Sequence, residues 1–287
     1  MIYIHAFGIH NVQPEKNPPD LKVVLRTLSG KVYRRIDRFI QLAIIGAHKA
    51  VASYELDPET ALYLTSGQGD IPVFARVRQQ RYFQKMMSKP VDFVNLASNT
   101  AGFYVASHLG LNGTNLFLSH HDFPVQMALL LAQSDLDLHK QSAILLGGVD
   151  GWFADQELAR KILGVNETTQ LGEGSNWMLL KRDLEGAVAS LTVEPELLDF
   201  SALKERIARA EPDVRLAFSS SLPVTVIDEI MGLRADCRRF NYEDLCAYYE
   251  TLPIFALNLF LRRESGELLH IDSDGERYMI MRIAQPD

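Results

Sequence analysis

The chain has 287 residues, of which 47% are hydrophobic and 23% charged, and its formal net charge is −7. This composition excludes a mostly disordered or collagen-like chain, and the acidic excess argues against a nucleic-acid binder, which usually has a basic surface. The two cysteines, Cys237 and Cys246, make neither a disulfide framework nor a zinc site, so we expect a reducing, cytoplasmic compartment. No stretch is apolar for long enough to predict a signal peptide or a membrane span.

Strands and helices are predicted to alternate over residues 1–184. The helix at 34–53 has apolar residues at helical spacing, and the strand at 142–150 is a continuous apolar run that ends in a glycine pair. The other predicted elements are strands at 2–7, 61–66, 115–119 and 175–181, helices at 94–109 and 123–133, and a proline-rich loop at 11–20. This order predicts a layered α/β domain whose sheet is buried on both faces.

Residues 185–287 have a weaker pattern. Predicted there are helices at 201–210, 225–233 and 241–263, a strand at 213–219, and a closing hairpin that turns at Asp274-Gly275. We expect 1–184 and 185–287 to be two halves that pack as one body. The basic stretch 76–87 is interpreted as a solvated helix face, with a docking patch for an acidic partner as the alternative.

The triplet His120-His121-Asp122 is the most reactive-looking motif in the chain. Neighbouring side chains of a strand point to opposite faces, so His120 and His121 are not expected to chelate one metal ion. Asp122 is expected near the N-cap of the following helix, where a carboxylate is stabilised by backbone N–H groups. A role for Asp122 as a functional acid is the alternative. We predict no metal and no cofactor.

Four stretches, taken in order, resemble a known family. They are Tyr33-Arg-Arg-Ile-Asp-Arg-Phe-Ile-Gln-Leu-Ala, Asn99-Thr-Ala-Gly-Phe-Tyr-Val-Ala-Ser-His-Leu-Gly-Leu-Asn-Gly-Thr-Asn115, Leu145-Leu-Gly-Gly-Val-Asp150 and Leu171-Gly-Glu-Gly-Ser-Asn-Trp-Met-Leu-Leu180. Their order and spacing are similar to the N-terminal half of the β-ketoacyl synthases, which are thiolase-fold condensing enzymes. The resemblance covers residues 1–183 and is fainter after 212. It implies a thiolase-like layered α/β/α/β/α fold with a shortened C-terminal half.

The catalytic residues of that family do not carry over to this sequence. The nucleophilic cysteine would fall on Asp122, or on His121 if the loop is one residue shorter. The two catalytic histidines would lie near 218–221 and 240–244, where no histidine occurs, and the closing oxyanion turn would lie at 274–277. Cys237 and Cys246 are expected to be buried structural thiols. We therefore predict no catalytic residue.

A sequence that has the family's fold motifs but lacks its nucleophile resembles the chain length factors, also called KS-β subunits. It resembles most of all those of bacterial aryl polyene clusters. The resemblance implies a heterodimer with a catalytic ketosynthase, an acyl carrier protein as second partner, and polyketide or other fatty-acid-like products. The residues expected at the acyl tunnel and dimer interface are Asn99, Phe103, Tyr104, Asn115, Ser119, His120 and Phe123. Two alternatives stay open. One is a thioester decarboxylase or hydrolase that uses His121 and Asp122, and the other is a homodimeric scaffold that binds a carrier protein through 76–87.

Overall fold

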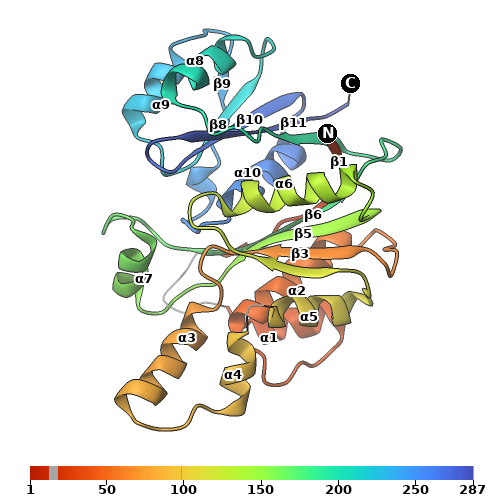
Figure 1. Ribbon diagram of the computed structural model, residues 1–287, viewed down its shortest axis with the longest axis vertical. Coiled ribbons are helices and arrows are strands. Elements are labelled where there is room, and N and C mark those ends of the chain that lie inside the picture. The colour runs from red at the N-terminus through yellow and green to blue at the C-terminus, as the bar shows by residue number, and fades with distance from the viewer. Residues whose placement is uncertain (13–18, 98, 287) are drawn as a thin grey trace.

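The computed structural model describes residues 1–12, 19–97 and 99–286, and within them the strands form one mixed sheet (Figure 1). The strands are β1 (Ile2–Gly8), β2 (Asn11–Val12), β3 (Ala61–Thr65), β4 (Asn115–Leu118), β5 (Ala143–Asp150), β6 (Glu173–Lys181), β7 (Ala189–Val193), β8 (Arg215–Phe218), β9 (Arg238–Arg239), β10 (Glu267–Ser273) and β11 (Tyr278–Ala284). Their spatial order is β4-β3-β5-β6-β1-β7-β11-β10-β8-β9, with β2 paired to β6 off this path.

Helices cover both faces of the sheet and fill the space between its two ends. They are α1 (Leu21–Ser29), α2 (Arg38–Val51), α3 (Ile71–Arg78), α4 (Pro90–Leu96), α5 (Thr100–Leu109), α6 (Pro124–Asp137), α7 (Gln156–Leu163), α8 (Phe200–Ala208), α9 (Val224–Met231) and α10 (Leu252–Arg263), with a π-helical turn η1 (Gln79–Phe83) and a 3-10 turn η2 (Glu243–Leu245). None of the helices in the described part of the chain is both long and apolar enough to cross a membrane.

The elements stack as five layers (Figure 1). Helices α1, α2 and α5 pack on one face of β3, β5 and β6, and α6 and α10 lie between these strands and the group β8, β10 and β11, which α8 and α9 cover on the far side. The central strand β1 pairs antiparallel with both β6 and β7 and so joins the two ends of the sheet. The layered α/β prediction is thus confirmed.

Several predicted boundaries were wrong for local reasons. The helix expected at 34–53 begins at Arg38, because Arg35 has a left-handed φ of 61° that a helix does not continue through. The helix expected at 94–109 is two helices, α4 and α5, because Ala97 is extended. The helix expected at 241–263 is only the turn η2 followed by α10, since Cys246 is extended between them.

Five elements, α1, α7, β2, β7 and β9, were not predicted, and part of one predicted loop cannot be compared. These elements are short, although α1 has apolar residues at helical spacing (Leu21, Val24, Leu25 and Leu28) and β7 alternates buried and half-buried residues. The expected proline-rich loop 11–20 begins with strand β2, and its residues 13–18 lie outside the described part of the chain. The closing hairpin is confirmed as β10 and β11, with Asp274 and Gly275 in its turn.

The glycine pair of β5 allows α10 and a tryptophan to approach the sheet closely. A Cβ atom on Gly147 would lie 2.2 Å from the ring of Trp177, and one on Gly148 would lie 2.7 Å from Ile254 of α10. Trp177 is fully buried, and protein interiors are close-packed, so the ring cannot easily move aside. Side chains at these two positions are therefore excluded by packing.

We expect Gly147→Ala to destabilise the protein by about 1–3 kcal/mol, because the added methyl group overpacks the core against Trp177. Urea denaturation followed by tryptophan fluorescence measures the change. Gly151→Ala is the matched control, since its Cβ would meet Phe39 at an ordinary 3.9 Å. Equal losses in both variants would contradict the packing argument.

Candidate functional site

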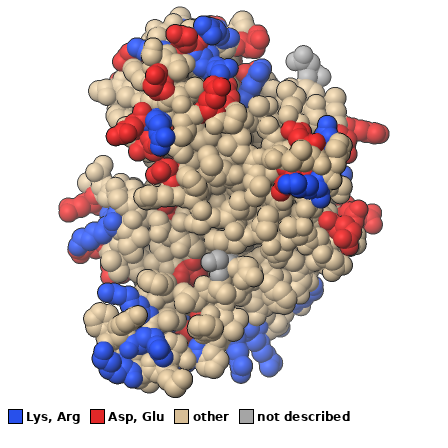
Figure 2. Space-filling view, in the orientation of Figure 1, with Lys and Arg blue, Asp and Glu red and all other residues tan. Residues whose placement is uncertain are grey.

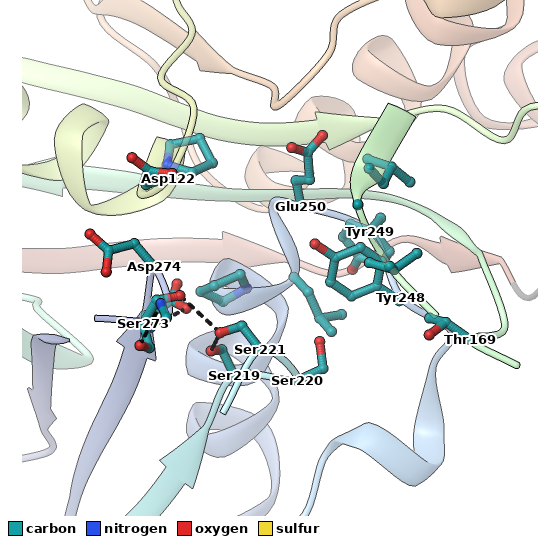
Figure 3. A pocket seen from close by; sticks show the side chains of 18 of the residues that line it. Asp122, Thr169, Ser219, Ser220, Ser221, Tyr248, Tyr249, Glu250, Ser273 and Asp274 are labelled. Atoms are coloured by element: carbon teal, nitrogen blue, oxygen red, sulfur yellow. Dashed lines mark hydrogen bonds between the residues drawn. The ribbon is translucent and has the colours of Figure 1, made fainter. Parts of the chain in front are cut away.

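A cavity of about 430 Å³, here called the polar cavity, lies where loops from both halves of the chain meet (Figure 3). Its walls come from the residues after β4, after α7 and after β8, from the segment before α10, and from the β10–β11 turn. The named wall residues include His121, Asp122, Thr169, Ser219, Ser220, Ser221, Tyr242, Tyr248, Tyr249, Glu250, Asp272, Ser273 and Asp274.

All four positions at which the family resemblance placed catalytic groups line this one cavity. His121 and Asp122 occupy the predicted nucleophile position. Ser219–Ser221 and Tyr242 occupy the two places at which the resemblance calls for a histidine. Asp274 and Gly275 belong to the closing turn. These positions are far apart in the sequence, so their meeting was not visible from any local motif. The geometry brings together the positions that the family resemblance singled out, and the side chains there are not those that the resemblance calls for.

The wall residues of the polar cavity include no cysteine, and no histidine among them is oriented by a hydrogen bond as a general base would be. The Ser219 and Ser221 hydroxyls bond to each other at 2.6 Å, and Ser221 donates to the Ser273 carbonyl at 3.0 Å, so this serine pair is tied into the wall. His270 contacts the Tyr242 hydroxyl at 3.1 Å but is fully buried, and burial lowers its pKa to about 4. Of the described histidines only His121 lines the cavity, and it is exposed.

The two cysteines lie away from this cavity, as expected. Cys237 is buried in the core beneath α8 and α9, and Cys246 is half-buried with its pKa raised to about 12 by burial. Neither residue lines the polar cavity, and neither would be a thiolate near neutral pH.

The position of Asp122 differs from the prediction. Helix α6 begins at Pro124 with Phe123 as its N-cap residue, so Asp122 lies one residue too early to cap the helix and is exposed. Strand β4 ends at Leu118, so His120 and His121 are loop residues and the expected alternation of strand faces does not apply to them. Within the described residues, no group of three or more His, Cys, Asp or Glu side chains could hold a metal ion.

Four carboxyl groups line the polar cavity, and no Lys or Arg is among its wall residues. Asp272 accepts hydrogen bonds from Gln126 and from the Ser273 backbone, and Asp274 accepts from the backbone of Glu276 and Arg277. These two carboxylates therefore hold the turn together. Asp122 and Glu250 are the two that face the cavity without such a structural task.

Glu250 is the residue that sequence reasoning missed. It lies close to the buried Asp150, and it accepts a hydrogen bond from Gln68 at 3.2 Å. Burial and the charge of Asp150 raise the pKa of Glu250 to about 8. Its carboxyl group is thus mostly protonated at neutral pH. The sequence marks Glu250 only by its position shortly before α10, which has Pro253 in its first turn.

The residues predicted at the tunnel and dimer interface fall into an exposed set and a buried set. Asn99, Ser119 and His120 are exposed, and Phe103 is 63% exposed on α5. The Phe103 ring meets Tyr104 edge-on at 5.6 Å, and Tyr104 in turn meets Tyr33.

The remaining two predicted residues are less accessible. Phe123 is 2% exposed and packs in the central core beside α6. Asn115 lies against Gly102 of α5, and its buried Oδ1 accepts no hydrogen bond from the described residues.

A second cavity, here called the apolar cavity, has a volume of about 570 Å³ and lies next to this region. Ala101 of α5, Phe117 of β4 and Ser119 form one wall. The other lining residues are Phe39, Ile40, Gln68, Gly69, Asp70, Ile71, Phe74, Asn95, Leu96, Ala97 and Ile162. Volumes of this size are typical of small-molecule sites.

Residues 71–94, here called the basic lobe, project from the body of the molecule as α3, η1 and α4 (Figure 1). Residues 71–91 contain five Lys or Arg and no Asp or Glu, in a chain of net charge −7. Figure 2 shows these cations gathered at the lower end of the molecule. Exposed apolar side chains lie among them, with Tyr82 71% and Met87 85% exposed.

Comparison with known proteins supports the fold through structure alone. No family model matches the sequence, and no curated protein matches it. The chain is similar to the ishigamide ketosynthase/chain length factor, with a TM-score of 0.77 and 13% identity over 100% of this chain and 99% of that chain.

Two other solved structures are similar over the same extent. One is a type II PKS acyl-carrier protein in complex with its ketosynthase bound to the hexaketide, with a TM-score of 0.71 and 10% identity over 99% of both chains. The other is a tetronic acid condensing enzyme, with a TM-score of 0.62 and 14% identity over 99% of this chain and 100% of that one. The chain therefore has the thiolase-like fold of ketosynthases and chain length factors.

The raised pKa of Glu250 predicts a pH-dependent stability. A carboxyl whose folded pKa is about 8, against an ordinary value of 4.5, contributes stability that is complete below pH 4.5 and is lost as pH rises through 8. Glu250→Gln cannot ionise, so we expect the variant to melt about 3 °C or more above the wild type at pH 8.5. At pH 4.5 the two should melt together.

Differential scanning calorimetry across this pH range measures the effect. Glu205→Gln, on the exposed face of α8, serves as control and should show no such pH-dependent gain. If the difference between Glu250→Gln and the wild type is the same at both ends of the pH range, the burial argument for Glu250 is wrong.

Proposed function

We propose that this chain is a non-catalytic chain length factor that pairs with a catalytic ketosynthase and shapes the tunnel for its growing acyl chain. The observation that supports the proposal is the polar cavity, which gathers the positions expected from the family resemblance and has no cysteine among its wall residues. The products would be polyketides, and the overall resemblance of the sequence favours an aryl polyene among them.

The surface around β4 supports a partner subunit. Strand β4 is at one end of the sheet and pairs only with β3 among the described strands, so its outer backbone groups are open to another chain. Phe103 on α5 and Phe93 on α4 are 63% and 70% exposed. An open strand edge beside exposed aromatic rings is typical of an interaction surface.

The apolar cavity supports the tunnel assignment. Its walls include Ala101 and Phe117, which belong to the two segments expected at the tunnel, and most of its lining side chains are apolar. A chain that enters from the exposed face of β4 and α5 would find there a volume of about 570 Å³. The depth of this cavity would then limit the length of the product.

The competing enzyme hypothesis rests on His121 and Asp122, which both line the polar cavity. The lack of Lys and Arg among the wall residues argues against it for a malonyl substrate, because the malonyl carboxylate would meet other carboxyl groups and no counter-charge. A decarboxylase would need to bind that anion before reacting.

Co-expression with a Cys-containing ketosynthase tests the proposal. We expect a stable 1:1 heterodimer by size-exclusion chromatography with light scattering, and no turnover of malonyl or acyl carrier protein by this chain alone. A homodimer that ignores the synthase would contradict the proposal. Turnover by the isolated chain that disappears in Asp122→Asn would establish the enzyme hypothesis instead.

Phe103 and Tyr104 are expected to control product length in that heterodimer. Both belong to α5, whose Ala101 lines the apolar cavity. Replacing either by Ala removes a bulky ring from this helix, so we expect the product distribution to shift toward longer chains, as measured by mass spectrometry. Leu138→Ala, equally exposed at 63% but distant from β4 in the sequence, is the control and should leave the distribution unchanged. An unchanged distribution in both aromatic variants would remove the tunnel assignment.

The basic lobe is proposed as the docking surface for the carrier protein, which the resemblance implies as second partner. Arg81 and Lys85 are exposed and form no ion pair within the described residues, so both are free to meet an acidic partner. We expect Arg81→Glu with Lys85→Glu to weaken carrier-protein binding about tenfold or more at low salt, measured by calorimetry. Arg209→Glu, at the C-cap of α8, is the control, and an equal loss there would exclude the lobe as the specific surface.

A further inference from the structure

Asp70 is the one acidic side chain among the residues that line the apolar cavity. Asp70 lines this cavity and caps helix α3, where its Oδ1 accepts a hydrogen bond from the Val73 backbone at 3.3 Å. Its second oxygen, Oδ2, is buried and accepts no hydrogen bond from the described residues. A buried oxygen without a donor is unfavourable, so this position has a hydrogen-bonding capacity that the surrounding chain does not use.

No cation forms an ion pair with the Asp70 carboxyl group within the described residues. Arg76 follows on the same helix, but its guanidinium pairs with Asp37 at 3.1 Å and with Asp92 at 2.9 Å. Burial and the nearby Asp37 raise the pKa of Asp70 to about 7. The group is therefore present near neutral pH both as carboxylate and as carboxylic acid.

A hydroxyl group fits this position better than other polar groups. It can donate to the carboxylate and accept from the carboxylic acid, so it is satisfied in either state of Asp70. An ammonium group would lose its water against Phe39, Phe74 and Phe117 and would find a partner that is only partly ionised. A second carboxylate would be repelled.

We propose that the apolar cavity holds the far end of an acyl chain that carries an uncharged hydroxyl group, and that Asp70 selects this chain by a hydrogen bond. The acyl nature of the ligand rests on the proposed function, whereas the hydroxyl preference follows from Asp70. A chain without the hydroxyl leaves Oδ2 unsatisfied and is rejected, because sites with a buried polar group discriminate strongly against analogues that lack its partner.

Two uncharged probes test the preference on the purified full-length chain. They are the methyl ester of decanoic acid and the methyl ester of the same acid with a terminal hydroxyl group, each titrated by calorimetry. We expect the hydroxylated ester to bind the wild type at least about fivefold more tightly. In Asp70→Ser, which keeps an N-cap oxygen for α3 but is shorter, the ratio should fall to about one.

Three further variants make the result specific. Asp70→Asn keeps an acceptor of the same reach and should retain most of the preference. Asp199→Ser alters the equivalent N-cap of α8, where the carboxylate accepts from Ala202, and should leave the preference unchanged. Ile71→Trp adds bulk to the wall of the cavity and should weaken both esters, which places the binding there.

The proposal is overturned if the wild type binds both esters equally or neither of them, if Asp70→Ser keeps the preference, or if Ile71→Trp leaves both affinities unchanged. None of these readouts needs a partner subunit. A hydroxyl preference without heterodimer formation would therefore reject the proposed function alone, and a heterodimer whose chain shows no preference would reject the role of Asp70 alone.

Discussion

The carboxylate of Asp150 is the contact on which the geometry of both cavities depends. It ends β5 and accepts hydrogen bonds from the Ser66 hydroxyl at 2.7 Å, from the Gly67 backbone at 3.2 Å and from the Thr251 backbone at 2.7 Å. The first two donors fix the chain that leads into the apolar cavity at Gln68 and beyond. The third fixes the start of α10 and, with it, the wall of the polar cavity. One buried carboxyl group, whose pKa is raised by burial, thus sets the relative placement of three chain segments.

The same carboxylate changes the chemistry of the polar cavity. Its charge, together with burial, keeps the neighbouring Glu250 protonated near neutral pH. The remaining acidic wall residues are either exposed, as Asp122 is, or bound into the β10–β11 turn, as Asp272 and Asp274 are. The cavity therefore keeps its shape through structural hydrogen bonds, and its wall residues include no cysteine.

Much of the fold followed from the sequence, because long apolar runs such as β5 and paired turn residues such as Asp274-Gly275 are local signals. The predicted helix boundaries were wrong where the backbone dihedrals of a single residue decide them, as at Arg35 and Ala97. The polar cavity was anticipated only through family resemblance, since its walls come from segments up to about 150 residues apart. Glu250 and Asp70 could not be found in this way. Both are ordinary acidic residues in the sequence, and only burial by distant segments gives them raised pKa values.

The two cavities differ in which of their groups are already satisfied. In the polar cavity the Ser219 and Ser221 hydroxyls bond to each other, and Asp272 and Asp274 accept hydrogen bonds from Gln126 and from backbone N–H groups, so these four side chains are satisfied within the wall. Around the apolar cavity several groups are incomplete in the described chain: the outer edge of β4, the exposed ring of Phe103 and the buried Oδ2 of Asp70. Unsatisfied backbone groups, exposed aromatic surface and an unpaired buried oxygen are each unfavourable, and each is relieved by binding. Their gathering at one end of the sheet argues that the proposed partner and ligand would meet this chain there.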